Sequence, residues 1–164
     1  MAVMNCWFYA AKAVVYAKTR RLLLEADYLS GAGTGWEEIT GRDVGPESWL
    51  RWGLPGDSFP DFASRFDFAQ PSSRPSTWTA EDLEATLRAC GPLWFGGANG
   101  SAHHVVVIHG IDRGAIDGDR RGELDRVHYG DPATGGNHLA ALDVFNGWKQ
   151  QTLRLWNPMF YAGR

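Results

Sequence analysis

The sequence has 164 residues, of which 44% are hydrophobic and 13% aromatic, so it can build one full core and is too apolar for intrinsic disorder. Its 16 basic and 19 acidic residues give a formal net charge of −3, and without a block of basic residues we expect no nucleic-acid partner. No apolar run approaches the roughly 20 residues that span a bilayer, and no secretory signal pattern is present, so we predict no membrane span and assign no compartment.

The first predicted element is a helix over about residues 6–28, either continuous or broken near residues 19–21, with a cysteine in its first turn. Three- and four-residue spacing marks a buried face made of Trp7, Ala10, Ala11, Val14 and Val15. With Asn5 at the N-cap position, Cys6 lies at the positive end of the helix dipole, which favours a nucleophilic thiolate. The alternative is a small buried hydrophobe, which is what most cysteines near a helix are.

Two shorter helices and a long loop are predicted next. Proline at the first turn and glycine at the end indicate a helix over residues 46–53. The loop over residues 54–77 contains four phenylalanines that we expect to anchor it to the body of the protein, namely Phe59, Phe62, Phe66 and Phe68. Thr79 and Asp82 form the capping pattern of a helix that ends at Cys90. No helix N-terminus supports Cys90, so we expect a buried structural thiol there.

The remainder of the chain predicts a mostly antiparallel sheet. Strands are expected over residues 92–95, 103–111, 124–129 and 152–156, with a turn over 131–136 and a short helix over 139–148. Helices followed by strands indicate an α+β fold. We predict a single domain over residues 1–164, with a helical part over about 1–90 and a sheet part over about 91–164.

Candidate partners for the cysteine lie in the sheet half. His103 and His104 open the long strand and point to opposite faces, so only one can serve a given site, and a packed histidine is the alternative for either. Asp131 follows the next strand in an Asp-Pro turn. Cysteine at a helix start, histidine on a strand and a third polar residue are the components of a thiol hydrolase.

The same three segments resemble the papain-like cysteine peptidases. Cys6-Trp7 followed by small residues is similar to the nucleophile motif of that clan. Its histidine strand places glycine six residues after the histidine, and Gly110 therefore selects His104 over His103 and His109. The segments 91–94 and 130–135 resemble the bacterial branch, which includes the C39-type leader peptidases and the AvrRpt2-like effector proteases.

The resemblance implies a papain-like fold, in which the N-terminal helix carrying the nucleophile packs on the sheet. It also implies a cysteine peptidase with Cys6 as nucleophile, His104 as acid and base, and Asp131 as the residue that orients His104. A bacterial effector or toxin domain, exported by a specialised system, fits this likeness. Its partners would be a protein or peptide substrate and an inhibitory immunity protein, and we expect no cofactor and no metal. A cell-wall amidase, a protein deamidase and an inactive papain-like binding module remain alternatives.

Three questions stay open in the sequence. The clan's glutamine, six residues before the cysteine, has no counterpart here, so the backbone N–H of Cys6 or the side chain of Asn5 or Asn99 would have to supply the oxyanion hole. A disulfide between Cys6 and Cys90 would remove the nucleophile. The third residue could be Asn137 or Asp143 in place of Asp131, a choice that mutagenesis would decide. Asp131, Asn137 and Asp143 are alternatives only for the role of orienting the histidine.

Overall fold

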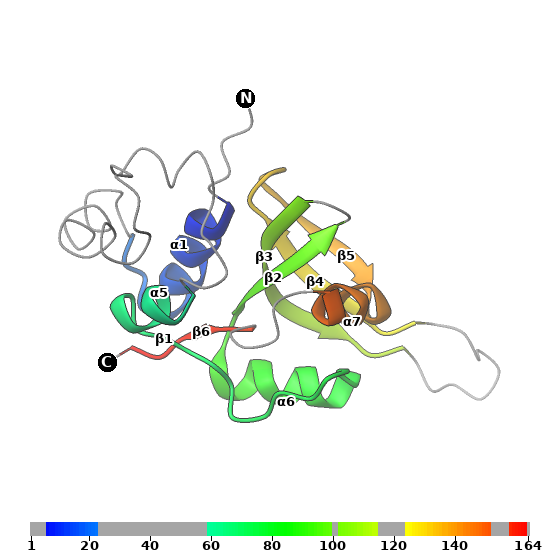
Figure 1. Cartoon of the computed structure of the whole chain (residues 1–164). Coiled ribbons are helices and arrows are strands. Elements are labelled where there is room, and N and C mark those ends of the chain that lie inside the picture. Colours follow the sequence, from blue (N-terminus) through cyan, green and yellow to red (C-terminus); the bar gives the residue numbers. More distant parts are fainter. Residues whose placement is uncertain (1–5, 23–58, 100–101, 115–123, 152–157, 164) are drawn as a thin grey trace.

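The computed structural model of the chain describes residues 6–22, 59–99, 102–114, 124–151 and 158–163, which form a sheet with helices on both faces (Figure 1). The four-stranded sheet has the order β2-β3-β4-β5, and every neighbouring pair is antiparallel. Its strands are β2 (Leu93–Asn99), β3 (Ala102–Asp112), β4 (Arg126–Asp131) and β5 (Gly136–Ala141). A small second sheet pairs β1 (Phe68–Ala69) with β6 (Phe160–Tyr161). The predicted α+β class is confirmed.

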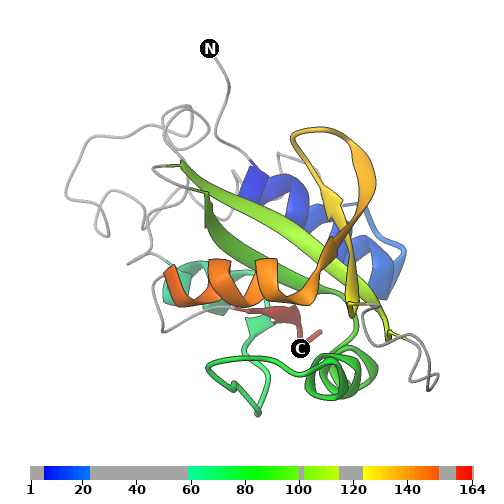
Figure 2. The ribbon, with the colours of Figure 1, turned by 90° about the vertical axis from the view of Figure 1, so that its right-hand side faces the viewer.

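The strand β3 separates two hydrophobic clusters because its side chains alternate between the faces of the sheet. Val105 and Val107 pack in the cluster of α1 (Cys6–Thr19) and α5 (Phe59–Arg65). Val106 and Ile108 pack in the cluster of α6 (Ala80–Cys90) and α7 (Leu142–Gln151). Figures 1 and 2 show α1 and α7 on opposite sides of the sheet, with the N-terminal end of α1 near the turn between β4 and β5.

The helix α1 begins at Cys6, as predicted, and ends at Thr19, where the sequence had left a break open. Its predicted face is buried, and Phe8 is buried beside it. The helix stops at Thr19 because Arg20 adopts a left-handed conformation with φ of 60°, which a right-handed helix cannot continue. Residues 23–28 of the predicted helix lie outside the described part of the chain.

The helix α6 confirms the capping pattern read from the sequence. The Thr79 side chain accepts a hydrogen bond from the Asp82 backbone, and the Asp82 side chain accepts one from the Thr79 backbone. Gly91 follows with φ of 80°, and its N–H donates to the Leu87 carbonyl. Cys90, the last residue of the helix, is buried among apolar side chains as expected.

Two segments differ from the prediction. The expected loop over 54–77 contains α5 and β1, although its anchoring is confirmed, since Phe62 and Phe68 are buried and Phe59 and Phe66 pack against the same cluster. The helix expected over 139–148 begins only at Leu142, after the unpredicted strand β5. Leu139, which was expected to lie in that helix, belongs to β5 and is 51% exposed.

Other expected boundaries move by a few residues. The strand expected over 92–95 extends to Asn99, and the one expected over 124–129 runs from Arg126 to Asp131. The helix predicted over 46–53 and the strand predicted over 152–156 lie outside the described residues. None of the described helices is long and apolar enough to cross a membrane.

Candidate active site

The thiol of Cys6 stands at the first position of α1, where backbone N–H groups are not used within the helix. No acidic side chain lies in this first turn, so none from the turn itself offsets the positive end of the helix. The next residue is fixed from the sheet, because the buried indole Nε1 of Trp94 on β2 donates a 2.9 Å hydrogen bond to the Trp7 carbonyl. This bond ties the first turn of α1 to the sheet that carries the other candidate residues.

His104, near the start of β3, contacts both other candidates. Its Nε2 lies 2.7 Å from Oδ1 of Asp131, and its side chain also forms a hydrogen bond with Cys6. Since Nε2 is engaged by the carboxylate, Nδ1 is the ring nitrogen left for the thiol. The side chains of His104 and Asp131 are 25% and 18% exposed, which shields their interaction while leaving the site accessible.

The carboxylate of Asp131 is held by the turn in which it lies. Asp131 ends β4, and its Oδ1 accepts a 2.8 Å hydrogen bond from the Ala133 backbone N–H. Its own carbonyl accepts from the N–H of Gly135, which adopts the left-handed φ of 71° that glycine tolerates. The Asp-Pro turn therefore fixes the direction of the carboxylate independently of its contact with His104.

The charges of the group favour a protonated imidazole between two acceptors. The hydrogen bond with Cys6 is the largest cause that raises the pKa of His104 to about 9, and the Asp131 carboxylate adds to it against the opposing effect of burial. Burial acts to raise the pKa of Asp131, but the Ala133 N–H and His104 together hold it below its ordinary value. An imidazolium beside a cysteine is the arrangement that stabilises a thiolate.

A glycine opposite His104 leaves room for an aromatic ring from α7. Gly97 on β2 pairs with His104 across the sheet, and a Cβ at residue 97 would lie only 2.7 Å from the Trp148 ring. Residues paired across antiparallel strands share a face, so Trp148 packs on the face that His104 occupies. The sequence analysis did not single out Gly97, whose one sign was a Gly-Gly pair in the middle of a strand.

The competing candidates are placed elsewhere. His109 forms a side-chain hydrogen bond with Asn137, and Asp143 is exposed in the first turn of α7. Both cysteines are free thiols at different hydrophobic clusters, since Cys6 packs against the cluster of α1 and α5 and Cys90 lies in the cluster of α6 and α7. The structure therefore does not contain the disulfide left open by the sequence. Asn5 and the side chains of Asn99 and His103 lie outside the described part of the chain.

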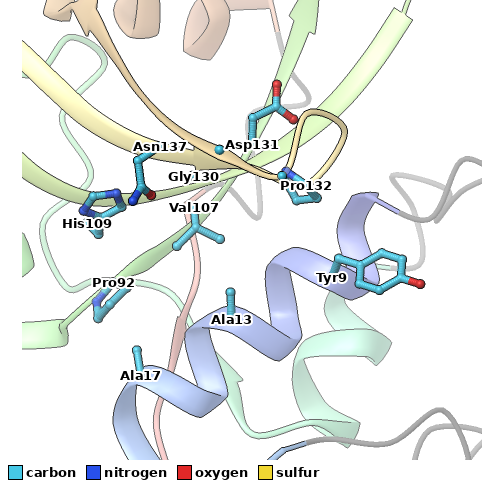
Figure 3. A pocket seen from close by; sticks show the side chains of 12 residues that line it. Tyr9, Ala13, Ala17, Pro92, Val107, His109, Gly130, Asp131, Pro132 and Asn137 are labelled. Carbon is cyan, nitrogen blue, oxygen red and sulfur yellow. The ribbon is translucent and has the colours of Figure 1, made fainter.

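A groove of about 610 Å³ lies between α1 and the face of β3, β4 and β5 that is turned toward this helix (Figure 3). Its helical wall is formed by Tyr9, Ala13 and Ala17, and the two alanines point toward the sheet. Pro132 lies at the end nearer the first turn of α1, and His109 at the other. This groove was not predicted, although the sequence places two alanines four residues apart on the helical stripe that contains Cys6.

Comparison with protein families gives a match to the family described as papain-like cysteine protease AvrRpt2 over residues 2–150. The chain belongs to this family. It is therefore a cysteine-dependent peptidase that acts on protein substrates, and its helices and antiparallel sheet agree with the papain-like fold. No curated protein matches the sequence significantly. The AvrRpt2 family match covers all three segments that carry Cys6, His104 and Asp131.

Proposed function

We propose that this peptidase cleaves peptide bonds with Cys6 as nucleophile, His104 as acid and base, and Asp131 as the residue that orients His104. The observation that carries the proposal is the continuous contact from Cys6 through His104 to Asp131, made by side chains far apart in sequence. Among the open candidates, Asp131 is supported by its 2.7 Å contact with His104. Asn137 instead pairs with His109.

The chemistry follows from the positions of these groups. The Cys6 thiolate attacks the carbonyl carbon, a C–S bond forms, and the carbonyl π electrons move to oxygen. As the intermediate collapses, the C–N bond breaks and the His104 imidazolium gives its proton to the departing amine. His104 then takes a proton from water, whose oxygen attacks the thioester, and the acid product leaves as the Cys6 thiolate returns.

The developing oxyanion needs a donor near Cys6. We propose the backbone N–H of Cys6 as this donor, because it lies in the first turn of α1, where N–H groups are not used by the hydrogen bonds of the helix. The Trp94 indole supports this donor indirectly, because it holds the adjacent Trp7 carbonyl. The first turn of α1 thus supplies both the nucleophile and a stabilising dipole.

The test is the pH dependence of Cys6 alkylation by iodoacetamide, measured by mass spectrometry with Cys90 as the internal control. A thiolate–imidazolium pair predicts rapid labelling of Cys6 below neutral pH, which His104→Ala abolishes while the labelling of Cys90 stays unchanged. Slow labelling of Cys6 with an ordinary thiol profile in the parent chain would contradict the proposed roles.

We further propose that the peptidase serves as a bacterial effector or toxin domain, with an inhibitory immunity protein in the producing cell. The support is the family to which the chain belongs, together with the resemblance of its Asp-Pro turn to that of bacterial members. Expression in a target cell should slow growth with the parent chain but not with Cys6→Ala. Equal effects of both chains would contradict this role.

A further inference from the structure

The groove beside α1 is continuous with the proposed catalytic group. Asp131 and its neighbour Pro132 belong to the groove lining as well as to the turn that holds His104. On the helical side, Ala13 and Ala17 follow Cys6 at offsets of seven and eleven residues, which a helix of 3.6 residues per turn places on one stripe. The helical wall of the groove therefore leads back along α1 toward Cys6, and the groove meets the proposed catalytic group at Asp131, since neither Cys6 nor His104 belongs to its lining.

The dimensions of the groove suit an extended segment of a polypeptide. A rise of about 1.5 Å per residue places Ala17 roughly 16 Å from Cys6 along the helix axis. An extended chain advances about 3.3 Å per residue, so about five residues cover that path. The volume of about 610 Å³ lies within the range of small-ligand pockets.

The lining of the groove favours uncharged side chains. None of the twelve described residues that form it is lysine, arginine or glutamate, and its one carboxylate, on Asp131, is engaged by His104. Burial lowers the pKa of His109, with the nearby His128 adding to this effect, so its ring is neutral at neutral pH. Its side chain hydrogen bonds with Asn137 at the end of the groove far from Pro132 (Figure 3).

The position of the groove also indicates which side of the scissile bond it receives. His104 must lie beside the departing amine in order to protonate it. The groove shares Asp131 and Pro132 with the His104 side of the group, so the chain that continues from that amine is directed into it. We infer that the groove binds an uncharged, extended segment of about five residues on the C-terminal side of the cleaved bond. This inference rests on the proposed function.

N-Chloroacetyl peptides test this inference without requiring a known substrate. Cys6 displaces chloride, so that a C–S bond forms as the C–Cl bond breaks, and the attached peptide extends on the leaving-group side. We would measure the rate of Cys6 labelling for uncharged Ala/Val peptides of one to five residues, each relative to chloroacetamide. The expected gain from one to five residues is at least about tenfold, the scale of one apolar group entering a pocket.

Substitutions in the helical wall show whether the increase in labelling rate with peptide length depends on the groove. Ala17→Trp should remove the gain from the longer peptides only, whereas Ala13→Trp should remove it for nearly all lengths. Ala85→Trp and Ala89→Trp provide matched controls, because both replace exposed alanines of α6 outside the groove and should leave the length dependence intact. If a tryptophan variant misfolds, as seen by circular dichroism, Ala13→Leu and Ala17→Leu replace it.

The outcomes separate the two proposals. No gain with length in the parent chain, or the same gain in both groove variants, would overturn the inference. A groove-dependent gain with peptidyl chloromethyl ketones, which place the peptide on the acyl side, would overturn its direction. Failure of the proposed catalytic group appears separately, as slow chloroacetamide labelling of Cys6 that His104→Ala does not change, and the length ratio remains measurable on that slower thiol.

Discussion

The two cysteines of this chain show how position decides what a thiol can do. Cys6 begins α1 and meets a histidine, whereas Cys90 ends α6 and meets apolar side chains. Burial raises the pKa of the Cys90 thiol, although Lys18 partly opposes it, so Cys90 stays protonated at neutral pH. The surroundings of Cys6 favour charged groups, whereas the apolar surroundings of Cys90 disfavour the charged thiolate, although both thiols lie at helix ends.

The largest expected effect comes from replacing each cysteine in turn. Cys6→Ala should lower peptidase activity by roughly 10⁴- to 10⁶-fold, the scale for loss of a nucleophile. Cys90→Ala should keep the activity but lower the free energy of unfolding by about 1 kcal/mol, because it removes a buried sulfur. Peptide cleavage and urea unfolding measure the two effects, and loss of activity in folded Cys90→Ala would contradict the division of roles.

A smaller loss of activity is expected when the orienting carboxylate is neutralised. Asp131→Asn weakens a charge-assisted hydrogen bond worth roughly 1.5–3 kcal/mol, which corresponds to about a 10- to 100-fold lower kcat. Asp143→Asn is the matched control, since it changes an exposed carboxylate on α7. Equal losses in both variants, measured by steady-state kinetics, would show that Asp131 has no special part.

The two regions should also lose stability in different pH ranges. The pKa of His104 is raised from 6.5 to about 9, so its contribution to stability is present below about pH 6.5 and is lost as pH rises toward 9. The pKa of Cys90 is raised above 9.0, so its contribution is lost only at still higher pH. Asp131 has a lowered pKa, and its contribution is lost as pH falls below about 3.8.

Urea unfolding across this pH range separates the contributions. His104→Ala should flatten the stability profile between about pH 6.5 and 9, whereas Cys90→Ala should change the profile only above pH 9. A profile that His104→Ala leaves unchanged in shape would contradict the raised pKa of the histidine.

The smallest effect is expected at the start of α6. Thr79→Ala removes the capping box and should lower the free energy of unfolding by about 1 kcal/mol while leaving catalysis unchanged. Thermal unfolding and the cleavage assay measure the two quantities together. A loss of activity at constant folding would mean that α6 affects the Cys6 region after all.

Sequence reasoning succeeded where the signal was local. Thr79 and Asp82 specify a helix start within four residues, and Cys6 lies at the beginning of a strongly patterned helix, so both positions were predictable. The strand β5 was missed because Leu139 points outward on a sheet edge, which hides the alternation of buried and exposed positions. Local patterns thus identified most elements and misjudged those at edges.

The candidate site was predictable only in part. A family resemblance selected His104, but nothing in the spacing of the residues requires its contact with Asp131, 27 positions away. The hydrogen bond from the Trp94 indole to the Trp7 carbonyl depends on tertiary geometry in the same way, whereas the one from the Ala133 N–H to Asp131 belongs to a local turn. The groove was missed because small side chains such as alanine leave a groove only where another element, here the sheet, lies opposite them. The sequence of the helix alone does not show that element.

The indole of Trp94 binds a carbonyl 87 positions earlier in the chain, in the first turn of α1, and this separation also sets the order in which the two groups are synthesised. A ribosome makes the thiol first, the indole and the imidazole much later, and the carboxylate later still. Under the proposed roles, a nascent or unfolded chain carries an ordinary cysteine and cannot digest the cell that makes it. Folding of β2, β3 and β4 onto α1 is then the step that makes the peptidase active.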